Sequence, residues 1–184
     1  MTINVIDSEQ DAGQRYPIGK FAPSLPVAET NLQQFIQDIA ALPAQMGQAV
    51  QGLTDEQLDT PYRSGGWSIR QVVHHVADSH MNSFIRFKLA LTEDAPTIKP
   101  YEEALWAELP DSKNEPIEVS LVLLEALHHR WVVLLKSLSE TDWQRVYIHP
   151  ASGKTPLVKV AGLYAWHGKH HLAHISNLRE LKEW

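Results

Sequence analysis

The sequence contains no cysteine among its 184 residues. Disulfide bonds and thiolate metal sites are therefore excluded, and any transition metal would have to be bound by imidazole, carboxylate or water. No apolar run approaches the roughly 18 residues that a membrane-spanning helix needs. The polar N-terminus also lacks the apolar centre of a signal peptide. We therefore expect a cytoplasmic protein that does not contact membranes.

Basic residues are scarce as well. The chain has 16 Lys and Arg against 22 Asp and Glu, which gives a formal net charge of −6. A surface of that sign repels phosphate backbones, and no stripe of Lys or Arg counteracts it, so we expect no nucleic-acid partner. Histidine, in contrast, occurs ten times, and four of the ten lie within the nine residues WHGKHHLAH near the C-terminus.

The pattern of apolar residues predicts an all-α four-helix bundle. No internal repeat or low-complexity tract is present, so residues 1–184 are expected to form a single domain. The proline-punctuated first 27 residues should lie extended across its surface. Apolar residues recur at helical spacing in four segments, residues 29–53, 68–93, 117–138 and 155–184. Pro43 should kink or restart the first helix, and Ser68 should cap the second.

The connections between these helices are expected to be irregular. Residues 94–116 contain four prolines and at most one short helix, and they form a connection much longer than the roughly 2–8 residues usual in bundles. Such a length permits a crossover between the second and third helices. Between the third and fourth helices, the stretch through Tyr147 and Gly153 is expected to be a loop without strands.

One stripe of the fourth helix suits a buried core position and carries three histidines. The stripe is Leu157, Val160, Tyr164, His167, His171, His174, Leu178 and Leu181. Its register points His167 and His171 into the bundle one turn apart, where both could reach one ion at the roughly 2.0–2.1 Å of a Zn–N bond. A rival stripe that contains His170 is half solvent-facing, so His170 should be exposed.

The other two helices give less decisive patterns. On the third helix, His128 lies in the middle of an apolar face and should point inward, whereas His129 should not. On the second helix, periodicity does not choose between His75 and His80. Because burying several imidazoles costs free energy unless their nitrogens are satisfied, the alternatives are a metal or a polar network that includes Tyr164 and Asn82.

Several stretches together resemble the DinB/YfiT-like family of metal-dependent hydrolases, over nearly the whole length. They are YPIGKF, GLTDEQLDTPYRSGGWSIRQVVHHVADSH, NSFIRFKLALTE, ALHHRW and GLYAWHGKHHLAHI. The resemblance implies a ligand histidine eight residues after Trp67, which is His75, and a ligand pair at His167 and His171. It also implies an up-down-down-up bundle and a homodimer. Wider relatives often have glutamine where this chain has His174, which leaves the role of His174 open.

Three imidazole ligands would leave a divalent cation a position for water, with Zn²⁺ the first expectation and Ni²⁺ the second. Gly168 stands where the metalloprotease motif H-E-x-x-H has its glutamate, so a general base must come from elsewhere. We predict His128 for that role, and Asp78 and Glu125 as weaker candidates to orient a ligand imidazole.

We predict a metal-dependent hydrolase acting on a small molecule. Two alternatives stay open. One is a metal-dependent thiol S-transferase, in which the metal would lower the pKa of a bound thiol, and the other is a non-catalytic metal-binding stress protein.

Overall fold

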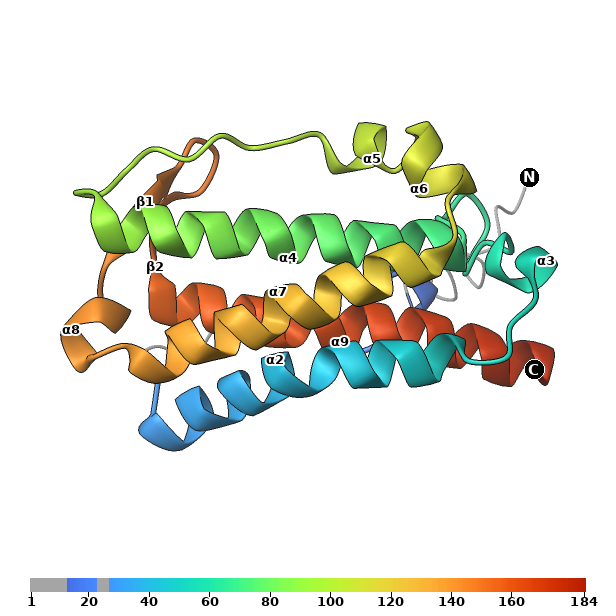
Figure 1. The fold of residues 1–184 in the computed structure, drawn as a ribbon, viewed down its shortest axis with the longest axis horizontal. Coiled ribbons are helices and arrows are strands. Elements are labelled where there is room, and N and C mark those ends of the chain that lie inside the picture. The colour runs from blue at the N-terminus through green and yellow to red at the C-terminus, as the bar shows by residue number, and fades with distance from the viewer. Residues whose placement is uncertain (1–12, 23–26) are drawn as a thin grey trace, which may run out of the picture.

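The computed structural model describes residues 13–22 and 27–184, and four long helices dominate it (Figure 1). They are α2 (Glu29–Val50), α4 (Ile69–Thr92), α7 (Ile117–Ser137) and α9 (Leu157–Lys182). In Figure 1, α2 and α9 run in one direction and α4 and α7 in the other, so the order along the chain is up-down-down-up. The predicted all-α four-helix bundle is confirmed.

Local sequence signals set the beginnings of the helices. Ser68 forms a capping box at the start of α4, as Thr54 does for the short α3 (Asp55–Leu58) and Ser139 for α8 (Glu140–Trp143). In each box, the hydroxyl accepts a hydrogen bond from the backbone N–H three residues further on, which satisfies a donor that the helix itself leaves free. The prediction that Ser68 caps the second long helix is confirmed.

Pro43 does not restart the first helix, because α2 is continuous from Glu29 to Val50. A proline in a helix interior removes one backbone hydrogen bond. Here α2 packs against both α9 and α7, so tertiary packing outweighs the local preference.

The crossover between α4 and α7 runs back along α4 and contains two short helices, α5 (Glu103–Trp106) and α6 (Pro110–Asn114) (Figure 1). The sequence predicts at most one short helix there, and this prediction is wrong. The crossover is tied to α4 by Gln71, whose Nε2 donates to the carbonyl oxygen of Ala107 at 2.7 Å.

A small β-hairpin replaces the loop that was predicted before the last helix. Its strands β1 (Val146–His149) and β2 (Gly153–Pro156) pair antiparallel. The backbone of Ile148 also bonds to the crossover, since its N–H donates to Pro96 and its carbonyl accepts from Ile98. These contacts with a distant segment stabilise strands of four residues, which their own sequence does not reveal.

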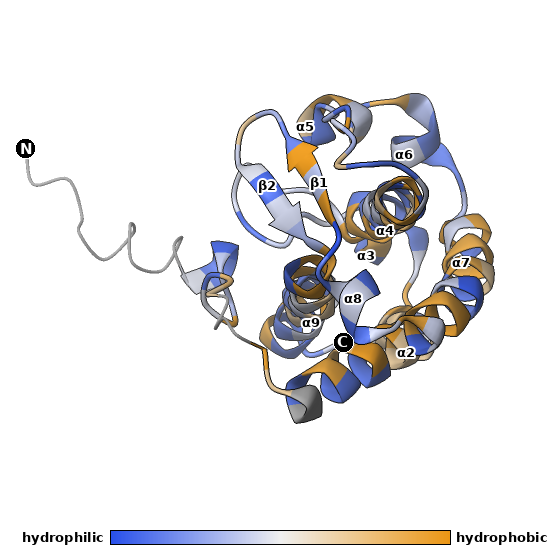
Figure 2. Cartoon of the chain, turned by 90° about the vertical axis from the view of Figure 1, so that its left-hand side faces the viewer, coloured by the Kyte–Doolittle hydropathy of each residue, from blue (hydrophilic) through white to orange (hydrophobic). Residues whose placement is uncertain are grey.

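Two apolar clusters fill the bundle, one toward each end. The first cluster includes Ile39, Phe87, Trp131 and Leu157, and the second includes Leu42, Val73, Leu124 and Ile175. Figure 2 looks along the bundle from one end and shows apolar residues on the four long helices. On α4, α7 and α9, His80, His128 and the histidines of residues 167–174 lie between members of the two clusters, so a polar layer crosses the middle of an otherwise apolar core.

The described part of the N-terminal segment, residues 13–22, contains a helical turn at residues 13–15. The prediction that this segment is extended also concerns residues 1–12 and 23–26, which lie outside the described residues. Within the described ranges, no helix is both long and apolar enough to span a membrane.

Candidate metal centre

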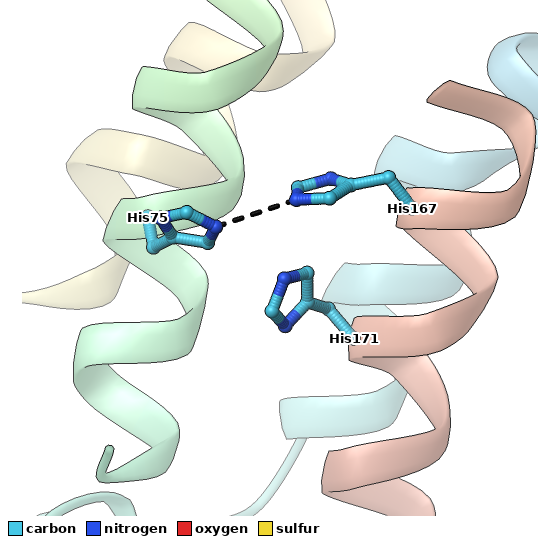
Figure 3. Close-up of side chains that lie close together, drawn as sticks. All are labelled: His75, His167 and His171. Carbon is cyan, nitrogen blue, oxygen red and sulfur yellow. Dashed lines mark hydrogen bonds between the residues drawn. The ribbon is translucent and has the colours of Figure 1, made fainter. Parts of the chain in front are cut away.

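Three histidines from two helices converge in the polar layer. His75 projects from α4, and His167 and His171 project from α9 toward it (Figure 3). One nitrogen from each ring lies within 4.8 Å of the other two. The Nε2 atoms of His75 and His167 are 3.3 Å apart. The structure therefore brings together the three residues that the sequence and the family resemblance had singled out as candidate ligands.

The inward stripe of α9 accounts for two of these positions. His171 and His174 are buried with the apolar members of the stripe from Leu157 to Leu178, while His167 is half-buried. Leu181 is exposed, so its predicted burial is wrong. On α4 the structure buries both histidines that periodicity could not separate, and they have different surroundings. His75 faces the α9 pair, whereas His80 lies five residues further along and contacts only His167 of the three.

His170 is buried, with 8% of its surface exposed, so the prediction that it is exposed is wrong. Its ring stacks on Trp166 at 4.6 Å between centroids, and Tyr16 of the N-terminal segment lies 6.1 Å away. A segment from outside the bundle thus covers a helix stripe that would face solvent in an isolated four-helix bundle. The nitrogens of His170, His171 and His174 form a second group within 4.8 Å, which shares His171 with the first.

His80 and His128 extend the first group into the core. His167 Nδ1 is 3.1 Å from His80 Nε2, and His80 Nδ1 is 2.9 Å from His128 Nε2. His128 Nδ1 donates to the backbone carbonyl of Ile39 on α2 at 2.6 Å. His128 points inward as predicted and is 1% exposed. Because both its nitrogens are hydrogen-bonded and His80 separates it from His167, its position does not suit direct proton transfer to a substrate.

His174 extends the group toward the N-terminal segment. Its Nδ1 lies 3.3 Å from His171 Nδ1, and its Nε2 donates to the carbonyl oxygen of Arg15 at 3.3 Å. Its ring stacks on Tyr62 at 3.9 Å between centroids. Spacing on α9 placed His174 inward, but nothing in the sequence indicated that a backbone carbonyl from residue 15 would meet it.

Burial keeps these imidazoles neutral. It lowers the pKa of His75 and of His174 to about 4, with repulsion from His170 adding to the effect, and it lowers the pKa of His128 to about 4. It lowers the pKa of His167 and of His171 as well, to which the neighbouring histidines contribute. A neutral imidazole has one nitrogen with a free lone pair, which is the form that binds a metal.

The two carboxylates that we considered as partners of ligand imidazoles lie differently. Glu125 is exposed on α7, in a surface groove with His129, and so lies away from the convergent histidines. Asp78 lies one turn from His75 on α4 and is half-buried, and burial together with Asp111 raises its pKa to about 6. The wall beside His75 is aromatic, since Trp67 lies 4.5 Å from it between ring centroids.

Comparison with known proteins agrees with this architecture. The model of the DinB superfamily matches residues 38–175. This chain is 58% identical over 170 residues to a protein of Bacillus cereus (strain 03BB102) named "Putative metal-dependent hydrolase". It is equally similar to two proteins with similar names, one from Bacillus thuringiensis subsp. konkukian (strain 97-27) and one from Bacillus mycoides (strain KBAB4). These matches cover 92% of this chain and 98% of each relative.

A solved structure is similar over the whole fold. YfiT from Bacillus subtilis, described as "a probable metal-dependent hydrolase with an unusual four-helix bundle topology", is 48% identical and superposes with a TM-score of 0.91. The match covers 94% of this chain and 99% of YfiT. On the family model, the relatives and this fold, the chain belongs to the DinB superfamily.

Proposed function

We propose that this protein is a metal-dependent hydrolase of small molecules, in which His75, His167 and His171 hold one divalent cation, with Zn²⁺ first and Ni²⁺ second. The observation that carries the proposal is the convergence of three imidazoles from α4 and α9, two buried and one half-buried, with one nitrogen of each within 4.8 Å of the other two. The names of the relatives, which refer to metal-dependent hydrolysis, support it.

The donor set fits such an ion. Two nitrogen ligands on a tetrahedral Zn²⁺, each at about 2.0–2.1 Å, are separated by about 3.3 Å. The Nε2 atoms of His75 and His167 are 3.3 Å apart. Imidazole is a suitable ligand for both zinc and nickel, whereas a cation such as Mg²⁺ requires oxygen.

When bound, the cation would supply Lewis acidity, which activates water for attack on a substrate. The protein's own residues hold the ligand nitrogens in place, and Trp67 covers one side of His75. Because the three ligands are uncharged, they would not neutralise the cation, and this keeps its Lewis acidity high. Gly168 leaves no carboxylate at the position of the metalloprotease glutamate, and the position of His128 suits support of the ligands better than proton transfer.

The ligand assignment is tested by metal analysis of purified variants. We expect the wild type to bind about one Zn²⁺ or Ni²⁺ per chain, and His75→Ala and His171→Ala each to lose most of it. His129→Ala, an exposed histidine on α7, is the matched control and should keep its metal. Retention of metal by both ligand variants would refute the assignment.

The reaction class is tested with the metal-loaded protein. Turnover of esters or amides without added thiol, which is lost in His171→Ala, supports hydrolysis. Turnover of an electrophile that depends on one particular low-molecular-weight thiol would instead establish the S-transferase alternative. Inactivity toward both kinds of substrate would leave a metal-binding protein.

A further inference from the structure

The hydrogen bonds around His128 determine which nitrogen of each linked imidazole carries a proton. The carbonyl oxygen of Ile39 can only accept, so His128 Nδ1 is the donor of their 2.6 Å bond. Burial of His128 keeps its ring neutral, and a neutral imidazole has a single N–H. His128 Nε2 must therefore accept, and its donor at 2.9 Å is His80 Nδ1.

The single N–H of a neutral imidazole also fixes the tautomers of the histidines nearer the candidate metal centre. Above the ordinary histidine pKa of about 6.5 the ring of His80 also carries a single N–H, and with that proton on Nδ1 its Nε2 accepts from His167 Nδ1 at 3.1 Å. His167 then has its proton on Nδ1 and a lone pair on Nε2. That Nε2 is the atom that faces His75 in Figure 3.

A second, shorter chain of hydrogen bonds fixes the tautomer of His171. The carbonyl of Arg15 accepts from His174 Nε2, which leaves a lone pair on His174 Nδ1. His174 Nδ1 accepts in turn from His171 Nδ1 at 3.3 Å. His171 is thus also protonated on Nδ1, with its Nε2 left as the free nitrogen. The two chains of hydrogen bonds end on backbone carbonyls of different segments, one on α2 and one in the N-terminal segment. Both place the proton of the candidate ligand on Nδ1.

We infer that His80, His128 and His174 are positioning residues that fix His167 and His171 in the Nδ1-protonated tautomer, so that both present Nε2 lone pairs to one point between α4 and α9. Ligand histidines usually donate their second nitrogen directly to a carbonyl or carboxylate, which fixes ring orientation and tautomer. Here other imidazoles stand between the ligand and the carbonyl. The effect on metal affinity rests on the proposed function, while the tautomers themselves do not.

The direct test is nitrogen NMR of protein with ¹⁵N-labelled histidine rings, treated with a chelator to remove metal. We expect His167 and His171 as Nδ1–H tautomers. In metal-free protein His75 Nε2 then donates to His167 Nε2 at 3.3 Å, so His75 should appear in the same spectra as the Nε2–H tautomer, and binding of a cation by this atom would move its proton to Nδ1 or to solvent. Observation of His167 or His171 protonated on Nε2 would overturn the inference.

Paired substitutions separate positioning from structural support. His80→Gln keeps an acceptor for His167 and a donor for His128, whereas His80→Leu removes both. We expect His80→Leu to release His167 into a mixture of tautomers and to weaken Zn²⁺ binding about 10–100-fold in competition with a chromophoric chelator, and His80→Gln to retain most of the affinity. His174→Gln and His174→Leu form an independent pair that reports on His171.

His74→Leu is the structural control, because His74 is buried on the same helix and bonds to Ser120 and Glu115 outside the network. Equal weakening by Leu and Gln at position 80, with unchanged tautomers, would reduce His80 to a structural role and overturn the proposal. If the expected tautomers are found but His75→Ala and His171→Ala keep their metal, the proposed function fails and the tautomer assignment stands. If metal binds through these residues but the tautomers are mixed, the tautomer assignment fails and the proposed function stands.

Discussion

The cost of each buried imidazole depends on whether its nitrogens have found partners. Both ring nitrogens of His128 are hydrogen-bonded. His170 Nδ1, in contrast, is buried without a hydrogen-bond partner among the described residues, although the ring stacks well on Trp166. An unsatisfied buried nitrogen costs free energy that an apolar ring of similar shape does not. The two histidines are therefore expected to respond in opposite ways to the same substitution.

In metal-free protein, His128→Phe should lower the free energy of unfolding by roughly 2–4 kcal/mol, because the Ile39 carbonyl and His80 Nδ1 each lose a partner at about 1–3 kcal/mol per group. His170→Phe should change it by less than about 1 kcal/mol, or raise it, since no hydrogen bond is lost and stacking on Trp166 is kept. Urea denaturation of both variants measures the difference. A larger loss in His170→Phe would contradict this account.

At this scale, a sequence predicts positions better than partners. Helical periodicity placed His128, His171 and His174 inward because it reports which face of a helix is apolar. It failed for His170, whose burial comes from the N-terminal segment. It also left His75 and His80 undecided, and the structure shows why, since both are buried on α4.

Among the long helices, α9 makes its most extensive contact with α2, and glycines permit the close approach. A Cβ atom on Gly168 would lie 2.7 Å from Leu42 Cδ2, and one on Gly162 would lie 3.0 Å from the ring of Phe35. Leu42 is buried in the core and has little room to move. Because Gly168 is next to His167, the spacing of α2 and α9 also affects the position of a candidate ligand.

Gly168→Val should therefore destabilise the protein by about 1–3 kcal/mol, the usual cost of overpacking a core, and should weaken metal binding by shifting α9. Gly47→Ala is the control. It lies within α2, and a Cβ atom there would meet nothing within 4 Å, so it should stabilise the helix by about 0.5–1 kcal/mol. Thermal unfolding and Zn²⁺ competition measure both effects. A Gly168→Val protein with wild-type stability would show that Leu42 moves aside at little cost.

The four long helices were predictable because their apolar periodicity extends over more than twenty residues each. The hairpin was not, because strands of four residues carry little pattern and are supported by hydrogen bonds from the crossover to Ile148. The second short helix of the crossover was missed for a similar reason. Elements of four or five residues depend on their neighbours more than on their own sequence.

Across the whole molecule, the layer of imidazoles makes folding sensitive to acid. Burial lowers the pKa of eight of the ten histidines: His74, His75, His80, His128, His167, His170, His171 and His174. At a pH above the unfolded pKa of about 6.5, these histidines are neutral in both states and do not change the free energy of unfolding. As the pH falls below that value, the unfolded chain takes up protons that the folded protein excludes.

Each such histidine removes stability by about 1.4 kcal/mol per pH unit, until the pH reaches its folded pKa. For His75, His128 and His174 this window extends down to about pH 4. Asp78 acts in the opposite direction, because its raised pKa of about 6 lets the folded state hold a proton that the unfolded state has lost. Glu103, whose pKa burial also raises, acts likewise. Because eight histidines lose stability as the pH falls and only two carboxyl groups gain it, the net effect of acid is to destabilise the folded protein.

We therefore expect the free energy of unfolding of the metal-free protein to be nearly constant between pH 8 and pH 7, and to fall steeply from about pH 6.5 to pH 4. Urea denaturation at half-unit pH intervals gives the slope, which should correspond to several protons taken up on unfolding. Zn²⁺ should raise stability most near neutral pH, where the ligand imidazoles of both states are unprotonated and the folded state alone presents them together. A flat stability profile between pH 7 and pH 5 would show that the folded and unfolded states take up protons on these histidines alike, and would contradict the lowered pKa values of His75, His128 and His174.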